Sequence, residues 1–263
     1  MAEALRAAVL IPALNEELRI REVVQGALAH CPTVIVVDDG STDRTLERIA
    51  DLPVTVIRHA ERMGKGEGLR DGFRAALALG VDGVLTMDGD GQHAAADIPR
   101  LLAAARTHPG HIVIGARLRK RARQPLHRRL ANEFGDWGIA WGTGYQIADT
   151  QSGQRYYPAE VAALGDVAGA GFVFEADILI EAARRLGTRC VSVPIESRYE
   201  GTMRLSHFRP LRDLWRITSH VVAKVLRRGG IWRRFVEIRA NPPIIHDDGV
   251  ASPRDALTPQ ESA

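Results

Sequence analysis

The chain has 263 residues, of which 45% are hydrophobic and 25% are charged, a composition typical of one soluble globular domain with a sizeable core. The formal net charge is only +3, so arginines gathered in a few segments matter more than the total and indicate locally anionic partners. Two cysteines without metal-ligand spacing argue against a disulfide framework and fit a reducing cytoplasm. Neither a signal peptide nor a run of about 18 apolar residues is present, so we expect no membrane span.

Short apolar runs alternate with amphipathic segments over the first half of the chain. Continuous runs of this kind are typical of strands that are covered on both faces. The runs are Ala7 to Pro12, Thr33 to Val37, Val54 to Ile57, Val84 to Met87 and Ile112 to Gly115.

Helices are expected between these runs. The first should have Asn15 as its N-cap, and the second should start near Ser41 or Thr42. Two more are predicted over Leu69 to Leu79 and Asp97 to Arg106. The alternation predicts an α/β fold with a doubly wound, mostly parallel sheet and helices on both faces. Ligands of such sheets bind beyond the carboxyl ends of the strands.

The segment Asp88-Gly89-Asp90-Gly91-Gln92-His93 places two carboxylates where the fourth run ends. Aspartate and glycine are also ordinary turn residues, which is the alternative interpretation. Oxygen ligands suit Mg²⁺ or Mn²⁺, and Mg²⁺ is usually bound by one or two carboxylates together with substrate phosphates. The motif therefore indicates a cation that holds a diphosphate.

Polar or glycine-rich segments also follow the first three runs. They are Pro12 to Glu16, Asp38 to Ser41 and Arg62 to Gly68. The third lacks the Gly-Lys-Ser/Thr ending of a P-loop and the position of a dinucleotide-binding motif. It is too rich in glycine for a plain helix start. Its backbone could approach a nucleotide with Lys65 near phosphate, or it could be a flexible turn.

In this order and spacing, the segments resemble the family 2 glycosyltransferases of GT-A (Rossmann-like) fold, particularly the dolichyl- or polyprenyl-phosphate mannose or glucose synthases. The likeness covers residues 7 to 205. The matching segments are Ile11 to Glu17, Val36 to Asp43, Gly64 to Gly66, Met87 to His93 and Ile114 to Arg117.

The resemblance implies a metal-dependent, inverting transfer of a hexose from a UDP- or GDP-linked sugar. Metal ligation is assigned to Asp88, Asp90 and Gln92 with Mg²⁺ or Mn²⁺, and Arg117 is placed near phosphate. A cation can stabilise the charge on a departing diphosphate without proton transfer. The remaining donor-site residues are Pro12, Asn15, Glu16, Asp39 and Lys65. Asp39 can accept a hydrogen bond from uracil or guanine, so it does not separate the two donors.

The segment Asp149 to Arg155 resembles the acceptor side of the family. A phosphate acceptor is already anionic and needs cationic positioning, whereas a hydroxyl acceptor needs a base, for which Asp149 is the candidate. The alternative for Asp149 is an ordinary turn residue. Glu175, at the start of a later helix, could orient acceptor-site groups or stabilise the helix dipole.

The usual Gly-x-Ser-Lys pattern of the family is altered in this chain. Either Arg204 or the pair Ser206-His207 could replace it. Arginine binds phosphate oxygens in a bidentate manner, which makes several residues candidate acceptor or phosphate contacts. These are Arg155, Arg198, Arg204, His207 and Arg209.

Three parts are expected along the chain: a GT-A domain over 1–209, a basic amphipathic helical segment over 210–240 and a disordered tail over 241–263. The middle part resembles an interfacial helix, and each cation near an anionic leaflet contributes about 1 kcal/mol. A solvated face packed on the domain is the alternative. The expected location is cytoplasmic and peripheral at the inner face of the membrane, beside a polyprenyl-phosphate or other lipid acceptor.

Other functions remain as alternatives. One is transfer to a lipid, pigment or polysaccharide hydroxyl, which paired phosphate and hydroxyl acceptors would separate. Another is a non-catalytic protein that binds nucleotides or nucleic acid. The first arginine cluster lacks interleaved aromatic residues, and the intact metal motif favours phosphate substrates, so no nucleic-acid partner is expected. The sequence leaves the sugar, the base and the oligomeric state open.

Overall fold

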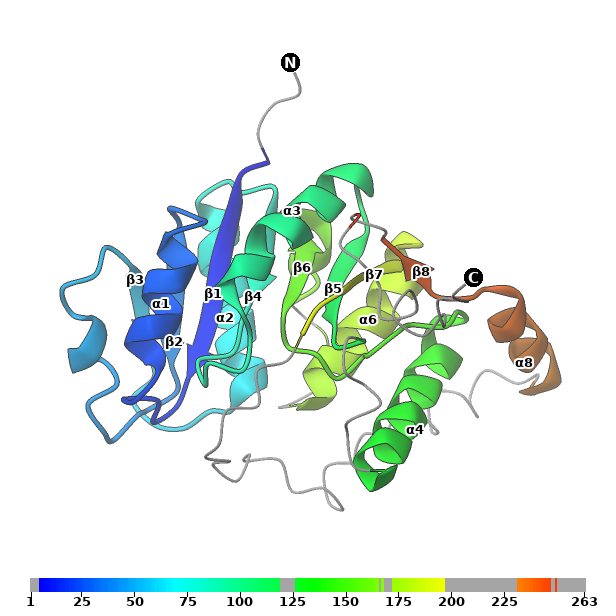
Figure 1. The fold of residues 1–263 in the computed structure, drawn as a ribbon, viewed down its shortest axis with the longest axis horizontal. Helices are drawn as coiled ribbons and strands as arrows, with labels where there is room; N and C mark the ends of the chain where they lie inside the picture. Colours follow the sequence, from blue (N-terminus) through cyan, green and yellow to red (C-terminus); the bar gives the residue numbers. More distant parts are fainter. Residues whose placement is uncertain are drawn as a thin grey trace, which may run out of the picture.

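The computed structural model describes residues 5–118, 126–165, 167, 172–196, 231–246 and 249, with the backbone alone for 126–134, 172 and 231–234. An eight-stranded sheet in the order β3-β2-β1-β4-β6-β5-β7-β8 forms its centre (Figure 1). β6 is antiparallel to both of its neighbours, and every other pairing is parallel. The strands are β1 (Ala7–Ala13), β2 (Val34–Asp38), β3 (Thr55–Arg58), β4 (Gly83–Thr86), β5 (Ile112–Ala116), β6 (Arg155–Pro158), β7 (Cys190–Pro194) and β8 (Ile244–Ile245).

Helices cover both faces of this sheet, as the sequence predicts (Figure 1). α1 and α3 pack on one face, and α2 and α6 pack on the other. The helices are α1 (Ile20–Leu28), α2 (Lys65–Ala78), α3 (Ile98–Thr107), α4 (Leu126–Thr143), α5 (Ala159–Ala162), α6 (Phe172–Leu186) and α8 (Ile231–Ala240), with 3₁₀ turns η1 (Glu47–Ile49) and η2 (Ala95–Asp97). None of these described helices combines the length and the apolar character that a membrane span requires.

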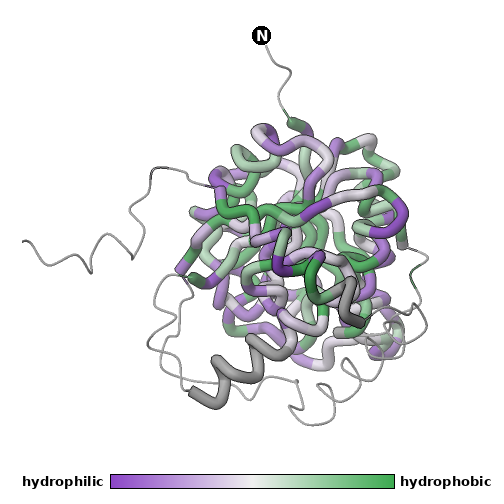
Figure 2. Tube along the Cα trace, turned by 90° about the vertical axis from the view of Figure 1, so that its right-hand side faces the viewer, coloured by the Kyte–Doolittle hydropathy of each residue, from purple (hydrophilic) through white to green (hydrophobic). Residues whose placement is uncertain are grey.

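Two apolar layers result from the period-2 geometry of the central strands. In β1, Ala8 and Leu10 join the layer under α2 and α6, while Val9 and Ile11 join the layer under α1 and α3. Successive side chains of a strand point to opposite faces, so a strand buried on both sides must be apolar at every position. Figure 2 shows hydrophobic segments through the middle of the molecule. The continuous apolar runs therefore position the strand ends, where the polar segments begin.

The first two predicted helix starts are wrong. α1 begins at Ile20, without Asn15 as its cap. Between β2 and β3, where the second helix was expected, the chain forms the short 3₁₀ turn η1 instead. Asn15 has a φ of 56°, and its Oδ1 accepts the Thr42 backbone N–H at 2.8 Å. The Asn15 N–H in turn donates to Ser41 Oγ at 2.9 Å. Side chains thus bond backbone groups across two loops, an alternative to helical hydrogen bonding that short polar residues offer.

The glycine-rich segment after β3 does start a helix, against expectation. α2 begins at Lys65, directly after Gly64, whose φ of 97° favours glycine. Within the helix, Gly72 lies so close to β1 that a Cβ would be 2.2 Å from the Leu10 side chain. The glycines here allow close packing of helix on sheet rather than a flexible turn.

The C-terminal part is described only from residue 231 to 246 and at residue 249. α8 confirms a helix within the expected segment 210–240 for its last ten residues, and Ile238 packs with Ala140 and Trp141 of α4. β8 pairs with β7, with Val191 opposite Ile244. The expected tail over 241–263 is therefore wrong at its start, because two apolar residues there extend the sheet.

Candidate active site

The ends of β1, β2 and β4 bring their polar segments to one edge of the sheet. The Asp39 N–H donates to Ala13 O, and the Met87 N–H donates to Leu10 O, so three strands leave the sheet side by side. Thr45 Oγ1 accepts the Glu16 N–H at 2.8 Å. The loops after β1 and β2, which carry the predicted donor residues, are thus fixed against each other.

Asp39 organises the start of α2. Its Oδ1 accepts the Met63 N–H at 2.7 Å, and its Oδ2 accepts the Gly64 N–H at 2.9 Å. A carboxylate at a helix N-terminus is stabilised by the unpaired N–H groups and by the dipole. The predicted base-binding residue is therefore also the anchor of the helix that carries Lys65.

His59 is a partner of Asp39 that sequence reasoning missed. Its Nδ1 lies 3.0 Å from Asp39 Oδ1 and its Nε2 lies 3.1 Å from Asp71 Oδ2. Burial lowers the pKa of His59, but hydrogen bonds and charge interactions with the two carboxylates raise it, and the net shift is upward. Two acceptors on one imidazole favour its doubly protonated form. No motif around position 59 signalled this role.

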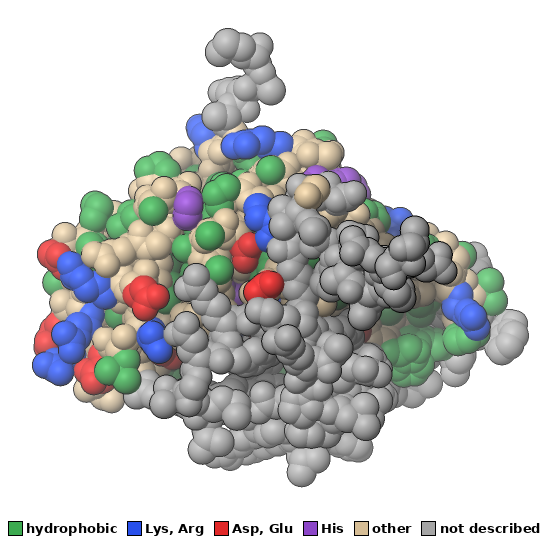
Figure 3. Space-filling model, in the orientation of Figure 1, with side chains coloured by type: hydrophobic (Ala, Val, Ile, Leu, Met, Phe, Trp, Pro, Cys, Tyr) green, Lys and Arg blue, Asp and Glu red, His purple; other side chains and the backbone are tan. Residues whose placement is uncertain are grey.

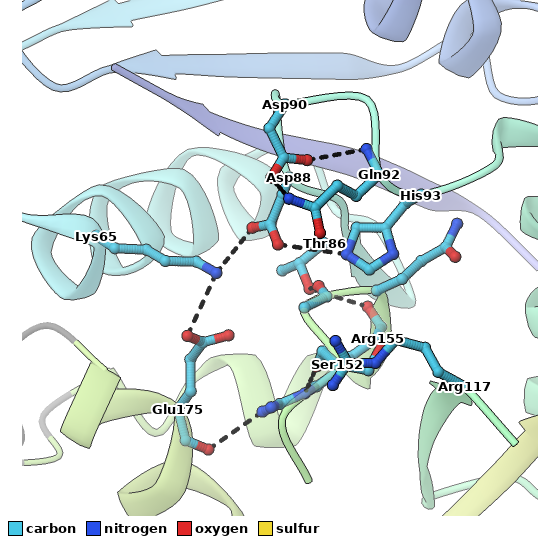
Figure 4. A network of polar contacts seen from close by, with 12 residues as sticks. Lys65, Thr86, Asp88, Asp90, Gln92, His93, Arg117, Ser152, Arg155 and Glu175 are labelled. Carbon is cyan, nitrogen blue, oxygen red and sulfur yellow. Dashed lines mark hydrogen bonds and ion pairs between the residues drawn. The ribbon is translucent and has the colours of Figure 1, made fainter. Parts of the chain in front are cut away.

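Asp88 and Lys65 form the centre of the site (Figure 4). Lys65 Nζ lies 2.7 Å from Asp88 Oδ1 and 3.3 Å from Glu175 Oε2, in the first turn of α6. Burial raises the pKa of Asp88, but Lys65 and His93 lower it, and the net pKa is well below the usual range. Burial likewise lowers the pKa of Lys65, while Asp88 and Glu175 raise it above the usual value. Both groups are charged at neutral pH.

His93 Nε2 lies 3.3 Å from Asp88 Oδ2 on the side away from Lys65 (Figure 4). The histidine is buried, with 8% of its surface exposed. Its Nδ1 has no hydrogen-bond partner among the described residues, and neither do Ser152 Oγ and Gln154 Oε1. His93 closes the Asp-Gly-Asp-Gly-Gln-His motif, so its sequence position was visible although its contact was not.

Asp90 differs from Asp88 in its surroundings. It accepts the Gln92 backbone N–H at 3.0 Å and the Gln92 side-chain amide at 2.7 Å. Burial and then the charge of Asp88 raise the pKa of Asp90. Two near carboxylates with excess negative charge form the hard oxygen donor set that Mg²⁺ or Mn²⁺ prefers.

No group of three His, Cys, Asp or Glu residues converges on a metal position within the described part of the chain. A cation held by Asp88 and Asp90 would take its other ligands from an amide oxygen, water and the oxygens of a bound diphosphate, as is usual for Mg²⁺.

Arg117 and Asp149 form a bidentate pair at the end of β5. The Arg117 backbone N–H and Nε donate to Asp149 Oδ2, and Nη2 donates to Oδ1, each at 2.7 Å. Burial raises the pKa of Asp149, but Arg117 lowers it, and the net shift is downward. A carboxylate in this state is a weak base, so the geometry disfavours the base role predicted for Asp149.

Arg155 lies in the core, with 2% of its surface exposed. Its guanidinium donates to Thr150 O at 2.7 Å, Ser152 O at 2.6 Å, Glu175 O at 3.2 Å and Tyr157 Oη at 3.1 Å. Four of the five N–H groups of an arginine are thereby used within the protein. This arrangement disfavours the phosphate contact predicted for Arg155, because the side chain joins the predicted acceptor segment, Asp149 to Arg155, to α6.

The acceptor segment packs directly against the metal motif. A Cβ on Gly153 would lie 2.4 Å from Asp88 Oδ2, and Thr86 Oγ1 donates to Gly153 O at 2.8 Å. Only glycine fits this close approach. The predicted donor and acceptor residues therefore meet at one place, although sequence reasoning did not identify Gly153 or Thr86.

Of the other predicted site residues, the structure describes Pro12 but not four arginine and histidine candidates. The Pro12 carbonyl borders the metal motif, 3.3 Å from a Cβ on Gly89. Four predicted acceptor or phosphate contacts lie outside the described residues: Arg198, Arg204, His207 and Arg209.

The fold and the strand-end site define a class, the glycosyltransferases of GT-A fold. The sequence profile of glycosyl transferase family 2 matches residues 8–160, and the chain belongs to that family. It is 33% identical over 205 residues to an undecaprenyl-phosphate mannosyltransferase of Micrococcus luteus, covering 73% of this chain and 83% of the relative. A polyprenol monophosphomannose synthase of Mycolicibacterium smegmatis is 30% identical over 204 residues, covering 72% and 76%.

Solved structures support the same fold. Glucosyl-3-phosphoglycerate synthase from Mycobacterium tuberculosis, in complex with Mn²⁺, UDP-glucose and phosphoglyceric acid, has a TM-score of 0.60 and 24% identity, covering 85% of this chain and 79% of that chain. The GT-A prediction and the assignment as a glycosyltransferase are confirmed.

Proposed function

We propose that the chain is a metal-dependent, inverting glycosyltransferase. It transfers a hexose from a UDP- or GDP-linked sugar to a polyprenyl phosphate at the cytoplasmic surface of the membrane. The observation that carries the proposal is the contact between Asp88 and Gly153, which joins a cation-binding carboxylate to the acceptor segment. Relatives named for transfer to polyprenyl or undecaprenyl phosphate support the acceptor class.

The donor would lie over the ends of β1, β2 and β4. Asn15, Glu16 and Asp39 would surround the nucleoside, because their loops are fixed together at this edge. Asp88, Asp90 and Gln92 would hold Mg²⁺ or Mn²⁺, and a divalent cation bound there would neutralise charge on the leaving diphosphate. A solved neighbour was crystallised with Mn²⁺ and UDP-glucose, which is consistent with this donor site.

The transfer itself would be a single displacement. A phosphate oxygen of the acceptor forms a bond to the anomeric carbon while the bond from that carbon to the diphosphate oxygen breaks. The electron pair of the broken bond leaves with the nucleoside diphosphate. The acceptor phosphate is anionic at neutral pH, so no general base is needed.

The state of Asp149 favours a phosphate acceptor over a hydroxyl. Its carboxylate is paired with Arg117 by three hydrogen bonds of 2.7 Å, and its pKa is lowered. A hydroxyl acceptor needs a group that readily takes a proton, which such a pair does not provide. We assign Arg117 and Asp149 to positioning of the loop after β5.

Contact with the membrane is assigned to the surface formed by α4 and α8. Large apolar side chains are exposed there, among them Trp137 at 49%, Phe235 at 38% and Val236 at 54%. Figure 3 shows hydrophobic side chains at the right-hand end of the molecule, the end at which α8 lies in Figure 1. Tryptophan is typical of membrane interfaces, and arginine adds attraction to anionic lipids. Arg239 lies over the Phe235 ring at 5.5 Å, which places a cation within this surface.

Transfer assays with paired acceptors test the proposal. Purified protein with Mn²⁺ and a radiolabelled UDP- or GDP-hexose is given either a polyprenyl phosphate or the matching polyprenol. We expect labelled lipid from the phosphate alone, and we expect loss of the product with EDTA. Product from the polyprenol alone would contradict the phosphate acceptor, while product from neither acceptor with any donor would contradict the proposed reaction.

A further inference from the structure

Lys65 occupies the position between the donor half and the acceptor half of the site. Its ammonium group contacts Asp88 at 2.7 Å and Glu175 at 3.3 Å (Figure 4). Asp88 follows β4 in the donor half, whereas Glu175 lies in the first turn of α6, beside the acceptor segment. The lysine therefore links two carboxylates that come from different halves of the site.

A cation that binds Asp88 is repelled by the Lys65 ammonium group and competes with it for the same carboxylate. The charge on Asp88 Oδ1 is already compensated by Lys65, while Asp90 accepts hydrogen bonds from Gln92, which is uncharged. Like charges in a largely buried site repel strongly, because the effective dielectric there is low. For a divalent ion and the ammonium group to bind next to each other at Asp88, a further anion must offset the repulsion between them.

The start of α2 connects Lys65 to the nucleotide side. Lys65 is the first residue of α2, and the preceding N–H groups of Met63 and Gly64 donate to Asp39. A diphosphate held near this helix end would find both the helix dipole and the lysine. The anion that would relieve the repulsion between Lys65 and the divalent ion is thus the diphosphate of the donor.

We propose that Lys65 is an exchangeable counter-ion. Without a divalent cation it neutralises Asp88, and when cation and nucleotide diphosphate bind together it moves from Asp88 to the diphosphate. Glu175 keeps the ammonium group within the site in both states. The inference rests on the proposed function and deepens it: divalent ions alone bind weakly, and cation and nucleotide bind synergistically.

Mn²⁺ titration followed by electron paramagnetic resonance tests the exchange, because the six-line signal of free Mn²⁺ falls on binding. Lys65→Met and Lys65→Gln remove the competing charge, and the glutamine keeps hydrogen-bonding capacity. We expect both variants to bind Mn²⁺ alone roughly tenfold or more tightly than the parent chain. The enhancement of Mn²⁺ affinity by UDP or GDP should shrink by a similar factor.

Glu175→Gln should not reproduce the gain in Mn²⁺ affinity. Lys65 is then left with Asp88, and a nearby negative charge is lost, so Mn²⁺ alone should bind no more tightly than in the parent chain. Arg21→Met is the matched control, since Arg21 pairs with Asp51 on the surface at 2.6 Å, away from the site. It should leave Mn²⁺ binding unchanged.

Weaker or unchanged Mn²⁺ binding in both Lys65 variants, with folding verified by thermal unfolding, would overturn the exchange. This result is expected if the ion pairs of Lys65 with Asp88 and Glu175 serve only to stabilise the fold. If neither the parent chain with nucleotide nor the Lys65 variants bound Mn²⁺, the donor site itself, and with it the exchange, would be contradicted.

Discussion

At the scale of single residues, the site depends on charged groups whose partners are fixed at short distances. His59 is the clearest case, because both of its ring nitrogens face carboxylates and only 6% of its surface is exposed. Its sequence position gave no signal, since the two partners lie 20 and 12 residues away. Asp88 and Asp90, in contrast, could be singled out from the sequence, because their motif directly follows a buried strand.

His59 should make stability depend on pH. Its folded-state pKa is raised, so its contribution is fully present below the unfolded value of about 6.5 and is lost as the pH rises through the folded value. We expect the difference in melting temperature between the parent chain and His59→Gln to be larger at pH 6 than at pH 9. A difference that stays constant or grows with pH would contradict the doubly protonated histidine.

Gly153→Ala should reduce metal-dependent nucleotide binding more than it reduces the stability of the fold. The added Cβ would lie 2.4 Å from Asp88 Oδ2, so the carboxylate must move. Overpacking of this kind costs about 1–3 kcal/mol in the free energy of unfolding. Metal-dependent nucleotide binding should fall by roughly tenfold or more, since a cation site needs correctly placed ligands. Calorimetric titration measures this.

Gly165→Ala is the control for this change, because among the described residues a Cβ there meets only Ala162 O, at 4.0 Å. Equal nucleotide affinities in Gly153→Ala and Gly165→Ala would show that the close approach to Asp88 is unimportant for binding.

At the scale of elements, the five strands β1 to β5 were predicted to within about a residue or two, because apolar runs buried on both faces have few alternatives. α2 and α3 were also largely predictable. The helix starts after β1 and β2 were not, since hydrogen bonds between Asn15, Ser41 and Thr42 join loops that are distant in sequence. The antiparallel position of β6 and the burial of Arg155 depend on tertiary pairing, which local patterns do not reveal.

Arg155→Lys should destabilise the acceptor segment. The arginine satisfies the carbonyls of Thr150, Ser152 and Glu175 together with Tyr157 Oη. A lysine nitrogen cannot reproduce this planar arrangement, and each buried group left unpaired costs about 1–3 kcal/mol. We expect urea denaturation to give a free energy of unfolding lower by about 2–4 kcal/mol. A loss of phosphate-acceptor affinity at unchanged stability would instead restore the phosphate role predicted for Arg155.

At the scale of the whole molecule, one sheet carries the residues proposed to bind donor and acceptor, and the α4 and α8 surface lies at its far end (Figure 1). The sequence predicted a helical segment over 210–240, and α8 forms its last ten residues. The packing of Ile238 on Trp141 and the addition of β8 to β7 could not be read from it, because residues distant in the chain form them.

Vesicle binding should depend on this surface. We expect the chain to co-float with vesicles that contain anionic lipid and to be released as salt is raised. Trp137→Ser should reduce co-flotation severalfold, because an exposed aromatic anchor is lost. Leu79→Ser, at another exposed apolar residue with 56% exposure, should not. Equal flotation of the two variants would exclude the α4 and α8 surface as the membrane contact.

We propose that Asp88 and Asp90 form a cation-dependent site for a nucleoside diphosphate. Isothermal titration of UDP and GDP, each with and without Mn²⁺, into the parent chain and Asp90→Ala tests it most directly. We predict binding of one of the two nucleotides in the presence of Mn²⁺, strongly weakened without Mn²⁺ and in Asp90→Ala. Nucleotide binding that is equally tight without Mn²⁺ and in Asp90→Ala, or no binding of either nucleotide, would contradict the claim.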